Sequence, residues 1–109
     1  MKINKVKNLI INVFTNHNLS RKHALICADA LVNAELVGAP SHGLARIISY
    51  CNRIKKKVIN PKPKIKIKKI SSSITQIDAD NAVGFIGANL GINQAIKNAK
   101  KTGIGFVAV

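Results

Sequence analysis

Apolar residues recur at helical spacing in the first half of the chain and at alternating spacing after it. In "MKINKVKNLIINVFTNHNL" they stand at positions 3, 6, 9, 10, 13 and 14, which predicts a helix from about Lys2 to Asn16. Ser20 is a suitable N-cap for a second helix from Arg21 to about Val37. Because this second helix is apolar on most sides, we expect it to be buried.

A third helix is expected after Pro40. Gly38 and Pro40 should end the second helix, Pro40 by disfavouring helical geometry at Ala39. Ser41 is then expected to cap the third helix. Its core face should carry the apolar residues at i, i+3, i+4 and i+7 spacing, namely Leu44, Ile47, Ile48, Cys51 and Ile54.

The second half of the chain predicts a β-hairpin followed by a helix and a strand. Lysines 64, 66 and 68 alternate with isoleucines 65 and 67, typical of a strand with one solvated face at a sheet edge. A second strand is expected over Ile74–Ala79, and a helix over Gly84–Lys101 with small residues where another backbone could approach closely. The closing "GIGFVAV" predicts a strand buried on both faces.

These elements indicate an α/β fold in two parts. Residues 1–60 should form a helical segment, and residues 61–109 the start of an incomplete α/β domain. A buried strand needs neighbours and covering helices, so we expect this chain to be the first part of a larger protein.

Charge and cysteine content change this picture little. The 109 residues carry a net charge of +14, from 18 basic and 4 acidic residues, which suggests an anionic partner. Fifteen of the basic residues are lysine, and isoleucine and asparagine are also abundant, as an AT-rich coding bias would produce.

No signal peptide or membrane span is predicted, so a cytoplasmic location is expected. Cys27 and Cys51 lie on apolar helical faces and should be buried thiols.

The densest polar chemistry is "GAPSHGLARIISY", residues 38 to 50. With Ser41 as the cap, His42 takes the first helical position and Arg46 lies one turn later on the same face. Tyr50 continues that stripe. A histidine can protonate a carbonyl and an arginine can hold a carboxylate, which together suit a 2-oxo acid. The alternative is an ordinary helix start with a cap and two solvated side chains.

Other motifs give weaker evidence of a functional site. The glycines of "GFIGANLG" stand at 84, 87 and 91, which is not the G-x-G-x-x-G spacing of a Rossmann dinucleotide turn. His17 and His23 have no accompanying ligand set, so no metal site is predicted. The lysine runs lack interleaved aromatic residues, which argues against a specific nucleic-acid surface.

The ordered blocks "LSRKHALICADALVNAELVGAPSHGLARIISY", "INPKPKI", "IDADNAVG" and "AIKNAKKTGIGFVAV" resemble the N-terminal portion of the malate/L-lactate dehydrogenase type 2 family. The resemblance implies a non-Rossmann α/β fold, NAD or NADP as cofactor, a small 2-oxo or 2-hydroxy acid as substrate, and usually a homodimer. It implies that His42 donates the proton and that Ser41, Arg46 and Tyr50 lie near the substrate.

The resemblance also implies that most cofactor-binding residues follow the region matched here, so none is assigned. The 109-residue chain by itself is expected to be inactive. Two alternatives stay open: an inactive gene remnant, and a basic module that binds polyanions without sequence preference. Pro40 departs from the polar residue that many members carry, which leaves the substrate undetermined.

Overall fold

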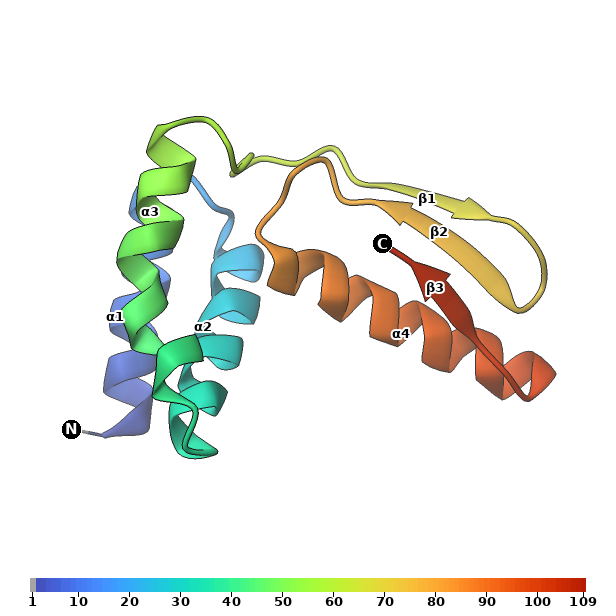
Figure 1. The fold of residues 1–109 in the computed structure, drawn as a ribbon, viewed down its shortest axis with the longest axis horizontal. Helices are drawn as coiled ribbons and strands as arrows, with labels where there is room; N and C mark the ends of the chain where they lie inside the picture. Colours follow the sequence, from blue (N-terminus) through green and yellow to red (C-terminus); the bar gives the residue numbers. More distant parts are fainter. Residues whose placement is uncertain (1) are drawn as a thin grey trace. The chain divides into compact units, whose positions relative to one another are not determined.

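The computed structural model describes residues 2–109 and divides the chain into two compact units, Met1–Lys62 and Pro63–Val109. The first unit is helical and the second holds a small sheet with one helix (Figure 1). The α/β class predicted from the sequence is confirmed.

The first unit contains the helices α1 (Ile3–Asn16), α2 (Arg21–Leu36) and α3 (Ile47–Lys55). Ser20 caps α2 as predicted, because its hydroxyl accepts a hydrogen bond from the His23 amide at 3.2 Å. The buried core side chains of this unit come mainly from α1 and α2, with two from α3 and two from outside the helices: Ile10, Ile11, Phe14, Leu19, Ala24, Cys27, Ala28, Leu31, Val32, Cys51, Ile54 and Ile59.

The segment between α2 and α3 differs from the prediction. Two short 3₁₀ turns, η1 (Pro40–His42) and η2 (Leu44–Arg46), precede α3, so Ser41 does not cap an α-helix. Gly43 separates them with φ −98° and ψ −133°, which lies outside helical geometry. The predicted core face is only partly right, because Cys51 and Ile54 are buried whereas Ile48 is 74% exposed.

The second unit contains β1 (Lys66–Lys69), β2 (Ile74–Asp78), α4 (Gly84–Thr102) and β3 (Phe106–Ala108). The strand order is β1-β2-β3, with β1 antiparallel and β3 parallel to β2. In Figure 1, α4 runs along the sheet and connects the two parallel strands. The predicted edge position of the lysine strand is confirmed, but Ile67 is 55% exposed and covers no core.

Small residues of α4 allow β3 to approach closely, as the sequence predicted. A Cβ atom at Gly87 or Gly91 would lie 2.8 or 2.9 Å from a methyl group of Val109, closer than real side chains pack. The closing strand has the composition of a buried strand, and in this chain it lacks the neighbours that would cover it. Phe106 is 60% exposed, because within residues 2–109 β3 pairs with β2 alone and α4 covers one face.

Candidate functional site

Ser41 connects the two side chains that the sequence analysis selected for chemistry. Its hydroxyl Oγ lies 3.0 Å from Nδ1 of His42, and its backbone carbonyl accepts a hydrogen bond from Nε of Arg46 at 2.9 Å. All three residues are exposed. We call Ser41, His42 and Arg46 the Ser41 cluster.

The cluster forms for a different reason from the one predicted. His42 and Arg46 were expected one turn apart on a single α-helix, but they lie in the separate turns η1 and η2. Hydrogen bonds to Ser41, and not helical spacing, bring the two side chains to one place.

The bond to Ser41 leaves one ring nitrogen of His42 for chemistry. A hydroxyl both donates and accepts hydrogen bonds, so Ser41 can accept from a protonated Nδ1 or donate to an unprotonated one. Among residues 2–109, Nε2 of His42 has no hydrogen-bond partner. A proton can therefore be given or taken at Nε2 while Nδ1 keeps its partner.

Arg46 is held by one nitrogen and presents the other two. Nε donates to the Ser41 carbonyl, whereas neither Nη nitrogen makes a hydrogen bond or ion pair within the described part of the chain. Two parallel N–H groups match the two oxygens of a carboxylate. The hydrogen bond to the Ser41 carbonyl thus orients the guanidinium and leaves both Nη nitrogens available to an anion.

Tyr50 contacts a neighbouring helix. It is half-buried, and its ring packs against Phe14 of α1, with centroids 6.5 Å apart and planes tilted by 57°. This contact stabilises the packing of α3 on α1. A substrate contact by Tyr50 stays a prediction.

Glu35, near the end of α2, was not selected from the sequence although it contacts this segment. Its Oε1 accepts a hydrogen bond from the Leu44 amide at 2.8 Å. The available signal was weak: Glu35 is one of only four acidic residues, and it stands eight positions before the glycine of "SHG". Its contact spans nine residues, which local helix rules do not consider.

A sequence model described as malate/L-lactate dehydrogenase matches residues 1–109, the whole chain. The chain belongs to the malate/L-lactate dehydrogenase family. The resemblance seen in the sequence is therefore confirmed. The match gives no support to a separate polyanion-binding module.

Relatives within the malate/L-lactate dehydrogenase family agree with this assignment. An L-sulfolactate dehydrogenase from Methanocaldococcus jannaschii is 41% identical over 102 residues, which cover 94% of this chain and 30% of that protein. A ureidoglycolate dehydrogenase (NAD(+)) from Escherichia coli K12 is 34% identical over 111 residues, or 100% of this chain and 32% of that protein.

The fold also matches a solved family member. The malate dehydrogenase of Pyrococcus horikoshii superposes with a TM-score of 0.94 at 34% identity, covering 98% of this chain and 31% of that one. The chain thus spans about 30% of the length of the family members it matches.

The dehydrogenase family implies a nicotinamide cofactor. The Ser41 cluster offers a proton carrier and a carboxylate-binding cation, and its three residues are exposed to solvent. A guanidinium can hold a phosphate as well as a carboxylate, so these groups do not by themselves identify a cofactor contact. We assign no cofactor contact to a residue of this chain.

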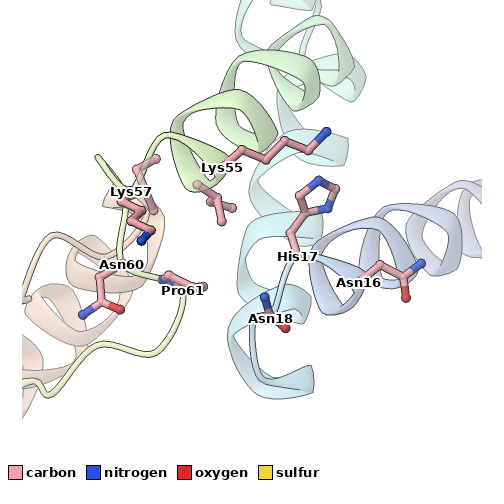
Figure 2. A pocket seen from close by; sticks show the side chains of 9 residues that line it. Asn16, His17, Asn18, Lys55, Lys57, Asn60 and Pro61 are labelled. Atoms are coloured by element: carbon pink, nitrogen blue, oxygen red, sulfur yellow. The ribbon is translucent and has the colours of Figure 1, made fainter.

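A separate cavity of about 730 Å³ lies between the end of α1 and the residues that follow α3 (Figure 2). Figure 2 shows Lys55 and His17 on one side of it and Lys57 and Asn60 on the other. Its nine lining residues include no carboxylate and no member of the Ser41 cluster. The cavity is thus distinct from the candidate site.

Other reactive groups play no part in the candidate site. Cys27 and Cys51 are free and buried, as predicted, and burial raises the pKa of both thiols, that of Cys27 to about 12. Both therefore stay protonated and unreactive near neutral pH. Residues 2–109 contain no cluster of three metal-ligating side chains. None of the helices they form has the length and apolar character needed to span a membrane.

Proposed function

We propose that residues 1–109 are the N-terminal part of an oxidoreductase that interconverts a small 2-hydroxy acid and the corresponding 2-oxo acid with NAD or NADP. Family membership supports the reaction class, and relatives named for sulfolactate and malate support the substrate class. The observation that carries the proposal is that Ser41 holds a proton carrier and a guanidinium together.

His42 is the proposed acid in the direction of reduction. A nicotinamide, when bound, would supply the hydride for the carbonyl carbon, and negative charge would then develop on the carbonyl oxygen. Nε2 of His42 gives its proton to that oxygen, which completes the hydroxyl group. Such general acid catalysis contributes about 10²- to 10⁴-fold in rate.

Arg46 is the proposed ligand of the substrate carboxylate. Its two Nη groups can donate two parallel hydrogen bonds, which orient the adjacent carbonyl toward His42. A plain ketone lacks this carboxylate, so Arg46 favours 2-oxo acids over ketones. Ser41 orients the His42 ring and Tyr50 borders the substrate in this proposal.

The remaining parts of the proposal follow from the family alone. We place the protein in the cytoplasm and expect the complete enzyme to be a homodimer. No membrane partner and no specific nucleic acid is proposed. The choice between NAD and NADP is left to the cofactor-binding part of the enzyme.

The test is His42→Ala in an enzyme that carries residues 1–109. Reduction of 2-oxo acids, including those corresponding to malate and sulfolactate, should fall about 10²- to 10⁴-fold in kcat. His23→Ala is the matched control, because His23 lies in the first turn of α2 and makes no side-chain hydrogen bond within residues 2–109. A His42→Ala enzyme as fast as the parent on every acid tested would show that the proposal is wrong.

A further inference from the structure

We infer that Glu35 is a positioning residue that sets the geometry of His42 relative to Arg46, a role that rests on the proposed function of those two residues. Glu35 belongs to the last turn of α2, outside the Ser41 cluster. It acts at the break between η1, which carries His42, and η2, which carries Arg46.

The first contact is a hydrogen bond to the start of η2. Oε1 of Glu35 accepts from the Leu44 amide at 2.8 Å, and Leu44 is the first residue of that turn. Amides at the start of a helical turn lack a partner within the turn, so a side-chain acceptor fixes where the turn begins. Glu35 therefore locates the turn that ends at Arg46.

The second contact is steric and explains the glycine of the Ser-His-Gly motif. A Cβ atom at Gly43 would lie 2.7 Å from Cδ and 2.8 Å from Cγ of Glu35, and closer still to Oε1. The Glu35 side chain occupies the place that a side chain at position 43 would need.

The preceding turn of α2 anchors Glu35 to the core of the first unit. Leu31 and Val32, one turn earlier, are buried in the core, whereas the Ser41 cluster is exposed and outside regular α-helix. Within residues 2–109 Glu35 makes no ion pair. The segment therefore uses Glu35 as a hydrogen-bond acceptor and a shape, and not as an ion-pair partner.

This distinction makes the conservative variant informative. Glu35→Gln keeps a side-chain oxygen and nearly the same shape, so it should keep the Leu44 bond. Glu35→Ala removes the acceptor, and Gly43→Ala leaves the acceptor but displaces it. Asp29→Ala is the matched control, because Asp29 is an acidic residue of the same helix that pairs with Lys7.

The first measurement is amide hydrogen exchange of the 109-residue chain, followed residue by residue by NMR. Exchange at Leu44 should quicken about tenfold or more in Glu35→Ala and Gly43→Ala, the loss expected for a bond to a charged acceptor. Asp29→Ala should leave it within about threefold of the parent, and Glu35→Gln, whose neutral oxygen accepts a weaker bond, should quicken it less than Glu35→Ala does. Unchanged exchange in both Glu35→Ala and Gly43→Ala would overturn the inference.

The second measurement is steady-state kinetics of an enzyme that carries residues 1–109. Glu35→Ala should lower kcat by about 10- to 100-fold, as expected for misplaced catalytic groups, with Glu35→Gln restoring most of it. Loss of kcat equal in Glu35→Gln and Glu35→Ala would overturn the acceptor role. If His42→Ala keeps full activity, the proposed function fails. The exchange rate of the Leu44 amide still tests the contact between Glu35 and Leu44 in that case.

Discussion

Replacing Arg46 with lysine tests whether the guanidinium binds the Ser41 carbonyl and the substrate carboxylate at the same time. Arg46 uses Nε to bind the Ser41 carbonyl at 2.9 Å and keeps both Nη nitrogens for a carboxylate. Lysine carries its charge on a single nitrogen. It can approach the Ser41 carbonyl or the substrate, but it lacks the planar arrangement that serves both at once.

The expected loss follows from the bonds that lysine cannot make. At least one charge-assisted hydrogen bond to the substrate is lost or weakened, worth about 1.5–3 kcal/mol. At about 1.4 kcal/mol per tenfold, kcat/KM for a 2-oxo acid should fall about 10- to 150-fold. Charge is retained in Arg46→Lys, so the loss measures geometry and not net attraction.

The assay compares 2-oxo acids with matched ketones that lack the carboxylate, in an enzyme that carries residues 1–109. Arg46→Lys should lower kcat/KM for the acids and change the slow reduction of ketones little. Arg53→Lys is the control, because Arg53 is an exposed arginine of α3 outside the Ser41 cluster. An equal loss for acids and ketones, or no loss for either, would refute the carboxylate role of Arg46.

Two further predictions concern the stability of the fold. Asn98→Ala should lower the free energy of unfolding by about 1–3 kcal/mol in urea titrations, because it leaves the buried Thr75 hydroxyl without the donor that lies 2.9 Å away. The exposed Asn93→Ala should change it by less than about 0.5 kcal/mol. Burial raises the pKa of Cys27 from 9.0 to about 12, so the unfolded chain loses this proton first and stability should fall as pH rises through that range. Cys27→Ala should remove that part of the pH dependence, and an unchanged slope would contradict it.

The elements predicted correctly are those that depend on residues close to one another in the sequence. Ser20 caps α2 through an amide three residues away, and Thr75 and Ile77 alternate with exposed neighbours along β2. The small residues of α4 also had a local signature. The sequence predicted that another backbone would approach them, and the backbone at Gly105, just before β3, does so: a Cβ there would lie 2.8 Å from the carbonyl carbon of Ala95.

The elements predicted less well depend on what covers a surface. Periodicity identifies an apolar face but not the partner that buries it, which explains why Ile48 and Ile67 were assigned to buried faces and are exposed. The closing strand differs, because its lack of covering neighbours was expected. Its sequence has the composition of a buried strand, and within residues 2–109 β3 has one neighbouring strand and one covering helix.

The two 3₁₀ turns that precede α3, which the sequence did not predict, explain how the candidate site forms. In an α-helix capped at Ser41, the Ser41 carbonyl would accept from a backbone amide four residues later. In the structure Gly43 breaks the helical path, and the Ser41 carbonyl accepts from the Arg46 side chain at 2.9 Å instead. A regular helix would have solvated His42 and Arg46 independently. The break at Gly43, beside the Glu35 side chain, is therefore what joins the two side chains through Ser41.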